Sequence, residues 1–296
     1  MSSSLRETNQ KYPFLTGKNV LQQQYKIMFE RFKITVKDLE ALRNKYPKPR
    51  FTLNPNKSQE FYDRILETCT HDGVIDGSDL SNLNFPFDYD GKTPKHYDVF
   101  ISYSHNDEQY ARYLYWFLTS QCKLSVFLDS TIWHSADALL KVIDDAYCKN
   151  VDNRTYNYRK RNYSTSHVHT LLSMAMLTAI ERSECFIFIE SENSTTLKDG
   201  LSDCSLSPWI YQESMFADVL PRVKPSRFDG YLRMITKSFA LVDSLKEGKK
   251  LMIRHKLRTM DFHSIYVEDL DMMKYITGLR GMDRLYLRKG IVEPIK

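Results

Sequence analysis

Three short segments of almost uninterrupted apolar residues constrain the fold of this chain most strongly. They are Tyr97-Asp-Val-Phe-Ile-Ser, Ser125-Val-Phe-Leu and Cys185-Phe-Ile-Phe-Ile. Runs of this length without alternating polar positions are typical of strands that are buried on both faces, as in a parallel sheet. We therefore predict that all three segments are core strands.

Helical patterns fill the intervals between these strands. Asn106–Cys122 carries its apolar residues on one helical stripe, and two further helices are predicted at about Ser135–Cys148 and Ser166–Arg182. Alternating strands and helices require right-handed crossovers and predict a doubly wound α/β fold, a flavodoxin-like parallel sheet with helices on both faces. Such a sheet binds its ligand at the carboxyl ends of the strands.

The chain before residue 94 has a different pattern. Leu21–Tyr46 is predicted to be helical, with a second helical run after Thr35. Large apolar residues recur three and four positions apart, at Tyr25, Met28, Phe29 and Phe32. Glycine and proline then crowd between residues 73 and 94, as in a linker. We predict a helical N-terminal extension over residues 1–94 and an α/β domain over residues 95–296.

Composition excludes several classes of protein. The chain has 42 Lys+Arg against 37 Asp+Glu, and a formal net charge of +5 is too small for a strongly basic nucleic-acid binder. Five scattered cysteines without a C-x-x-C pair indicate neither a disulfide framework nor a cysteine-rich zinc site. No apolar run approaches the roughly 20 residues that cross a bilayer, and the polar start differs from a signal peptide. We expect a soluble, cytoplasmic protein without a membrane partner.

The sequence also lacks the motifs of several common chemistries. It contains no G-x-x-x-x-G-K-[ST] phosphate loop and no G-x-G-x-x-G after the first strand, so neither ATP-driven work nor a bound redox dinucleotide is expected. Ser104 and His105 belong to no nucleophile elbow. His167 and His169 are two residues apart on a helix and point in different directions, so no metal site is predicted.

The segment Ser207-Pro-Trp-Ile-Tyr-Gln-Glu has the features of a helix start that carries a reactive face. Ser207 is a good N-cap, and Pro208 suits the first helical position. Trp209 and Glu213 are four residues apart and therefore share one face of the helix. An indole attracts a cationic ring, and a carboxylate stabilises positive charge that develops next to it. The alternative is that the tryptophan packs in the core and the glutamate is solvated.

Four blocks of the sequence, in order, resemble the TIR (Toll/interleukin-1 receptor/resistance protein) domain family. Tyr97–Asp107 looks like its opening strand and loop, and Val126-Phe-Leu-Asp looks like its second strand before the BB loop. Ala179–Ile189 resembles its next helix and strand, and Ser207–Glu213 matches its S-x-W-x-x-x-E signature. The resemblance covers about Tyr97–Leu220 and is closest to prokaryotic TIR proteins of anti-phage defence.

The resemblance implies an enzymatic activity. Enzymatic TIR domains use the glutamate of this signature to cleave NAD, with release of nicotinamide and formation of ADP-ribose or a cyclic product. Glu213 is thus the expected catalytic residue, with NAD+ as substrate and no cofactor. Nicotinamide leaves a pyridinium as a neutral molecule, so one carboxylate suffices, whereas an ordinary glycosidase needs two. The alternative is a non-catalytic scaffold that assembles through TIR–TIR contacts.

Further substrate-binding candidates lie at strand ends and in the BB loop. Tyr103 and Ser104 end the first strand, where backbone and hydroxyl groups can meet adenine or phosphate. By resemblance, Asp129 lies beside the nicotinamide ribose or at the base of the BB loop; an Asx turn is its alternative role. Trp133 is expected to contact substrate or a neighbouring subunit, or else to anchor its loop. Trp209 is expected to form the nicotinamide platform.

The resemblance also implies partners, and the sequence departs from the family at several places. Self-association is expected, because TIR active sites are often completed by a neighbour's BB loop, and a downstream effector can read a nucleotide product. Ser130–Asp137 lacks the usual glycine, and the last strands are placed around Leu232–Ile235 and Leu251–Leu257. A basic and aromatic insertion, Asn150–Tyr163, interrupts the second crossover. It suits phosphate or single-stranded nucleic acid, but a solvated loop is commoner, so nucleic acid is not an expected partner.

Overall fold

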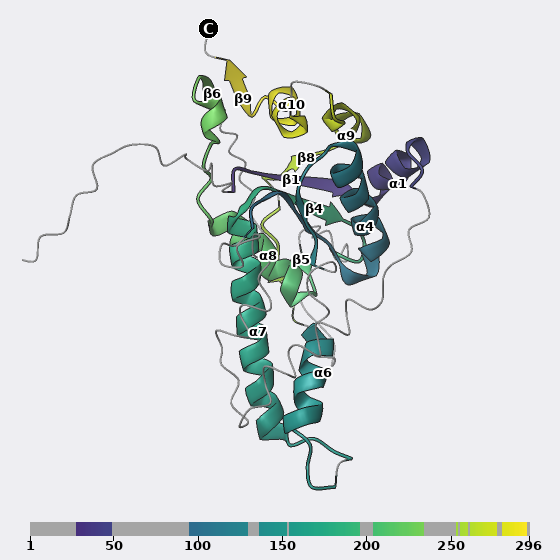
Figure 1. The fold of residues 1–296 in the computed structure, drawn as a ribbon, viewed down its shortest axis with the longest axis vertical. Helices are drawn as coiled ribbons and strands as arrows, with labels where there is room; N and C mark the ends of the chain where they lie inside the picture. The colour runs from purple at the N-terminus through teal and green to yellow at the C-terminus, as the bar shows by residue number, and fades with distance from the viewer. Residues whose placement is uncertain are drawn as a thin grey trace, which may run out of the picture.

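The chain folds into an α/β structure with a five-stranded parallel sheet flanked by helices (Figure 1). The computed structural model describes residues 28–48, 95–129, 136–152, 154–195, 204–233, 253, 255–259, 261–276 and 280–294. The strand order is β3-β2-β4-β1-β8, and every neighbouring pair is parallel. These strands are β1 (Glu30–Thr35), β2 (Tyr97–Ser102), β3 (Val126–Phe127), β4 (Ser183–Glu190) and β8 (His263–Ser264).

The three strands predicted from apolar runs are confirmed as β2, β3 and β4. They form one side of the sheet, and their side chains are buried on both faces. Phe100 of β2 stacks on Phe127 of β3 and on Phe186 of β4, with ring centroids 4.9 Å and 5.5 Å apart. This row of rings explains why the runs contain no polar alternation.

The prediction of a helix across Glu30–Thr35 is wrong, because these residues form strand β1 between β4 and β8. Glu30 and Arg31 resembled the polar side of an amphipathic helix. Both are in fact buried, and both bind residues almost 200 positions away in the chain. Residues 28–48 therefore belong to the same sheet as the residues after 95, which the division near residue 94 did not anticipate. Residues 49–94 lie outside the described residues.

The helix predicted after Thr35 is confirmed as α1 (Val36–Lys45), since the Thr35 side chain accepts a hydrogen bond from the backbone N–H of Asp38. The order of β3, β2 and β4 is that of the first three strands of a flavodoxin-like sheet. The fourth position is taken by β1, from the N-terminal part of the chain, and the fifth by β8. The arrangement is thus consistent with the flavodoxin-like fold that the sequence predicts.

The described parts of the strands predicted around Leu232–Ile235 and Leu251–Leu257 are not in this sheet. β6 (Tyr231–Arg233) pairs with β9 (Val292–Pro294), and β7 (His255–Lys256) pairs with β5 (Cys204–Ser205), both antiparallel. The fourth and fifth sheet positions are instead occupied by β1 and β8, so these segments form small ribbons outside the sheet.

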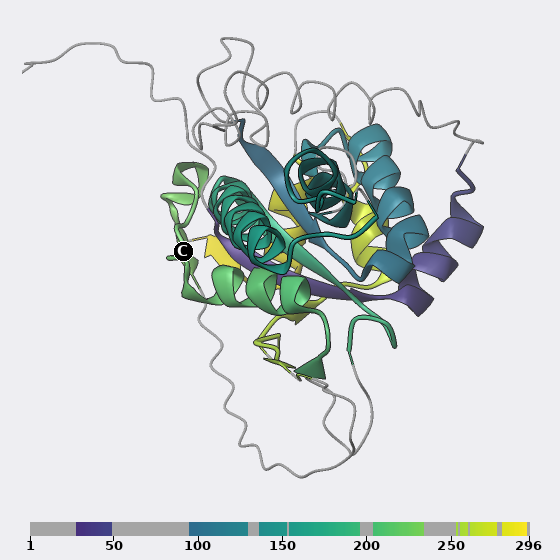
Figure 2. The ribbon, with the colours of Figure 1, turned by 90° about the horizontal axis from the view of Figure 1, so that it is seen from below.

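Helices cover the two faces of the sheet, with α7 and α8 on one side and α4 on the other (Figure 2). The α4 side also holds α1, α9 and α10, whose apolar residues share one cluster with Ile34, Ile101 and Ile187. The remaining helices and helical turns are α4 (Glu108–Trp116), α6 (Ala136–Tyr147), α7 (Tyr158–Glu181), α8 (Pro208–Val219), α9 (Val267–Met273), α10 (Gly281–Arg288), η1 (His105–Asp107), η2 (Phe117–Gln121) and η4 (Ser226–Phe228).

Helices α6 and α7 form a hairpin that extends away from the sheet (Figure 1). Its own small core contains Leu139 and Ile143 of α6 and Val168 and Leu172 of α7. Helix α7 begins eight residues before the predicted start, because the Asn157 side chain caps it by accepting from the N–H of Lys160. The end of the basic insertion is therefore helical and not a loop. No helix in the described part of the chain is long and apolar enough to span a membrane.

Candidate active site

The signature glutamate lies on the buried side of α8. As predicted, Ser207 caps this helix by accepting from the N–H of Ile210, and Pro208 follows at the first helical position. Glu213 is 7% exposed, so its carboxyl group is withdrawn from water. The alternative of a solvated glutamate is therefore wrong.

The Glu213 carboxyl group contacts the end of strand β2. The hydroxyl of Ser102 donates a hydrogen bond of 2.5 Å to Oε2 of Glu213. Ser102 is two residues after Phe100, so both side chains point to the α7 and α8 side of the sheet. Ser102 was not among the predicted site residues. The available signal was a polar residue at the end of a strand whose interior is apolar, because a buried hydroxyl needs a partner.

The surroundings of Glu213 favour its neutral form. Burial raises the pKa of Glu213 to about 8, the donated bond from Ser102 opposes this, and the negative charge of Asp129 raises the pKa further. Within the described ranges, Glu213 forms no ion pair. The carboxyl group is thus mostly protonated at neutral pH in the unliganded protein.

Asp129 and Tyr103 connect the ends of β2 and β3. The hydroxyl of Tyr103 donates a 2.6 Å hydrogen bond to Oδ1 of Asp129, and the tyrosine ring packs in the α4-side core. Because the charge of Asp129 acts on Glu213, the structure brings together three of the predicted site residues at one edge of the sheet.

Trp209 lies one turn before Glu213 and has a clear packing role. Its indole stacks on the ring of His169 of α7, with centroids 5.1 Å apart and planes 17° apart. The half-buried ring also packs against the core of the α6–α7 hairpin. A second contact between α7 and α8 joins Ser173 Oγ to Gln212 Oε1 at 3.1 Å. One face of the indole is therefore occupied by His169.

The loop after β2 is fastened to the loop after β4. Ser104 is buried, and its carbonyl accepts from the N–H of Asp107. The Asp107 carboxylate in turn accepts from the hydroxyl of Ser191 and, at 2.7 Å, from the side-chain amide of Asn193. These bonds hold the two loops together at the carboxyl ends of β2 and β4, the edge where a doubly wound fold binds its ligands. Trp133 and residues 130–135 of the predicted BB loop lie outside the described residues.

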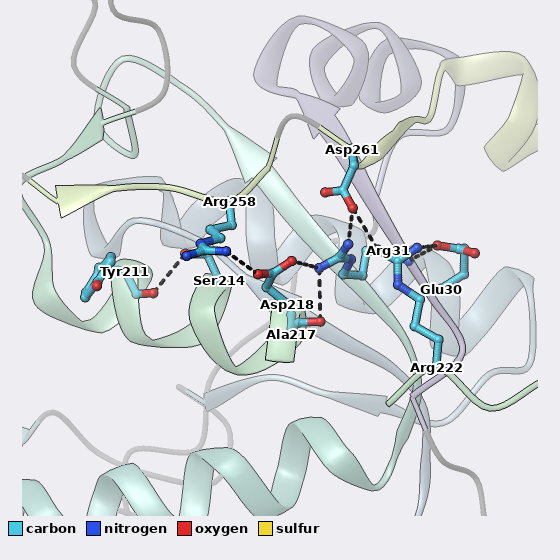
Figure 3. A network of polar contacts seen from close by, with 9 residues as sticks. All are labelled: Glu30, Arg31, Tyr211, Ser214, Ala217, Asp218, Arg222, Arg258 and Asp261. Atoms are coloured by element: carbon cyan, nitrogen blue, oxygen red, sulfur yellow. Dashed lines mark hydrogen bonds and ion pairs between the residues drawn. The ribbon is translucent and has the colours of Figure 1, made fainter. Parts of the chain in front are cut away.

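A network of ion pairs fixes the far end of α8 to strand β1 (Figure 3). Arg31 is buried, and it donates to the carbonyl of Ala217 at 3.2 Å, to Asp218 at 2.9 Å and to Asp261. Its guanidinium also lies over the ring of Phe262. The helix that carries Glu213 is thus anchored at its last turn to strand β1.

Two further arginines complete this network. Arg222 binds Glu30 at 3.0 Å and Asp261 at 2.8 Å, and Arg258 binds Asp218 at 3.0 Å. The three arginines thus face three carboxylates, which balances their charges at the junction of β1, α8 and the segment before β8.

Among the residues that the structure describes, no group of three or more His, Cys, Asp or Glu side chains is arranged to hold a metal ion. Comparison of the chain with protein-family models, with curated protein sequences and with solved structures finds no match.

Proposed function

We propose that this chain is a TIR-domain NAD+ glycohydrolase or cyclase. It cleaves the bond between ribose and nicotinamide to give ADP-ribose or a cyclic ADP-ribose-type signal, as a component of anti-phage defence. The proposal rests first on the four ordered sequence blocks. The observation that carries it furthest is the buried Glu213 carboxyl group at the end of β2, bonded to Ser102 and close to the charge of Asp129.

The chemistry requires one ionised carboxylate. As the C1′–N bond of NAD+ breaks, both electrons go to the nicotinamide, which leaves neutral, and positive charge develops on the ribose. Ionised Glu213 stabilises that charge in a site with little water, where the interaction is strongest. Water, which releases a proton to the solvent, then forms the new bond to C1′ and gives the linear product. Attack by a nucleophilic atom of the same nucleotide gives the cyclic product instead.

The high pKa of Glu213 suits a cationic substrate. A positive pyridinium near a carboxyl group favours the ionised form and lowers its pKa. Bound NAD+ therefore ionises the group that acts on it, while the free protein avoids a buried, unpaired charge. Asp129 adds to the negative potential that attracts the cationic ring.

The pH dependence of catalysis tests this assignment. We expect kcat/KM to rise with pH, with an apparent pKa near 8, because this parameter reports the free enzyme. Ser102→Ala removes a bond that lowers the pKa of Glu213, so its profile is expected to shift to higher pH. Ser102→Thr keeps a hydroxyl and serves as the control. A flat profile between about pH 6 and 9.5, or equal profiles for Ser102→Ala and the wild type, would contradict the assignment.

The function itself is tested by incubating the purified chain with NAD+ and analysing all nucleotides by mass spectrometry. ADP-ribose with free nicotinamide indicates hydrolysis, and a product lighter by one water indicates cyclisation. If NAD+ stays intact at high protein concentration and in extracts of infected cells, the scaffold alternative replaces the enzyme.

Self-association predicts a particular dependence on protein concentration. If a neighbouring copy completes the site, product formation per molecule rises with concentration, and the rate in a dilution series is expected to exceed first order. Nicotinamide release measured over about a hundredfold dilution gives this order directly. Strict proportionality between rate and protein would contradict a shared site.

A further inference from the structure

The far end of the α6–α7 hairpin carries basic and aromatic side chains that divide into two groups. We call residues 149–152 and 154–163 the hairpin tip; they belong to the connection between the helices and to the first turns of α7 (Figure 1). One group of its side chains holds the tip together. The other forms no ion pair within the described part of the chain.

The first group consists of Lys149, Tyr156 and Arg161. Arg161 pairs with Asp144 at 2.8 Å and lies over the ring of Tyr156, 5.3 Å from its centre. The hydroxyl of Tyr156 donates to Asp145 at 2.6 Å, and Lys149 pairs with the same carboxylate at 3.1 Å. The two aspartates at the end of α6, Asp144 and Asp145, are thus paired within this group.

The second group contains three cations. Arg154, Arg159 and Lys160 are exposed and form no ion pair with any residue in the described ranges. Asp152 is the one acidic residue of the tip, and its carboxylate accepts from the N–H groups of Arg154 and Thr155 to shape the turn. Helix α7 itself has no acidic side chain before its last residue. The cations therefore leave a positive surface along the first turns of α7.

Exposed rings accompany these cations. The side chains of Tyr158 and Tyr163 are 77% and 70% exposed. The ring of Tyr163 lies against that of His167, with centroids 4.3 Å apart. Arg159, Tyr163 and His167 are each four residues apart, so a guanidinium and two rings follow one another along one face of α7.

We propose that the hairpin tip binds single-stranded nucleic acid. Arg154, Arg159 and Lys160 contact phosphates, and unpaired bases stack on Tyr158 and on the Tyr163–His167 pair. An acidic protein would use the cations equally well but would have less need of the exposed rings. The sequence alone does not distinguish these cations from those that are paired within the fold, and a basic segment of this kind is more often a solvated loop. The proposal is independent of NAD+ cleavage.

The test uses the full chain and a fluorescently labelled oligothymidylate of about 12 nucleotides, with binding followed by anisotropy at several salt concentrations. Wild-type protein is expected to bind, with affinity falling steeply as salt rises. Arg159→Ala/Lys160→Ala is expected to weaken binding about tenfold and to flatten the salt dependence by about 1.4 in log–log slope. Tyr163→Ala is expected to weaken binding about tenfold with the slope unchanged.

The matched control is Lys37→Ala/Arg43→Ala, which removes two exposed cations from α1 and is expected to leave binding unchanged. Absence of wild-type binding at low salt would overturn the proposal. So would an equal loss in the control, which indicates attraction by net charge alone. Polyglutamate binding as tightly as the oligonucleotide, with no effect of Tyr163→Ala, would assign the tip to an acidic protein instead.

Discussion

Glu213→Gln is expected to lower nicotinamide release by about a thousandfold or more, because glutamine keeps the shape of the side chain but cannot carry the negative charge that stabilises the ribose cation. Ser102 can still donate to the amide oxygen, so the fold is expected to be intact. Nicotinamide formation by the two proteins at equal concentration and pH is the measurement. Retention of more than about a tenth of the wild-type rate would show that Glu213 is not the catalytic group.

The same substitution is expected to stabilise the protein. The pKa of Glu213 is about 8 in the folded state, against an ordinary 4.5 in the unfolded chain. Below pH 4.5 the carboxyl group is neutral in both states, so its ionisation does not change the free energy of unfolding there. As pH rises from 4.5 to 8, ionisation favours the unfolded chain and the folded state loses stability. Glutamine does not titrate, so the variant is expected to gain about 3 kcal/mol over the wild type at pH 7.

Denaturant unfolding over a pH series measures this gain, with the exposed Glu192→Gln as control. The difference between Glu213→Gln and the wild type is expected to vanish below about pH 4.5 and to grow up to about pH 8. A variant that is less stable than the wild type at pH 8 would contradict a buried, neutral carboxyl group.

Arg31→Ala is expected to lower the free energy of unfolding by about 2–4 kcal/mol, because it removes the buried hydrogen bonds from Arg31 to Ala217, Asp218 and Asp261. The comparison is Arg258→Ala, at the exposed rim of the same network, where about 1 kcal/mol or less is expected. Urea unfolding at neutral pH gives both values. Equal losses for the two variants would show that the buried arginine has no special role in anchoring α8.

The sequence pattern predicts those parts of the fold whose stabilising contacts are apolar. Strands β2, β3 and β4 have side chains that need only an apolar environment, so their composition identifies them. Strand β1 was missed, because Arg31 is buried through partners on α8 and before β8 that no local pattern reveals. The start of α7 was missed for a similar reason, since a single cap at Asn157 decides where the helix begins.

The same distinction holds for the site. The spacing of Ser207, Trp209 and Glu213 predicts a helix start with its cap, and the structure has both. Ser102 was not predicted as the partner of Glu213, because the contact joins residues 111 positions apart. The stacking of Trp209 on His169 likewise depends on the packing of α7 on α8, which the sequence does not reveal. This tryptophan therefore has an observed packing role in addition to its proposed role toward nicotinamide.

The most direct test of Glu213 as the group that acts on NAD+ is the number of protons released when the dinucleotide binds. Calorimetric titration of the chain at pH 7 with a carbocyclic NAD+ analogue, which keeps the pyridinium but is not cleaved, in buffers of different ionisation enthalpy, measures the protons released on binding. Because Glu213 has a pKa of about 8 and the pyridinium lowers it, the release of about one proton per bound analogue is expected. The Glu213→Gln variant is expected to bind with no such release. Binding without proton release in the wild type, or with equal release in the variant, would contradict the assignment.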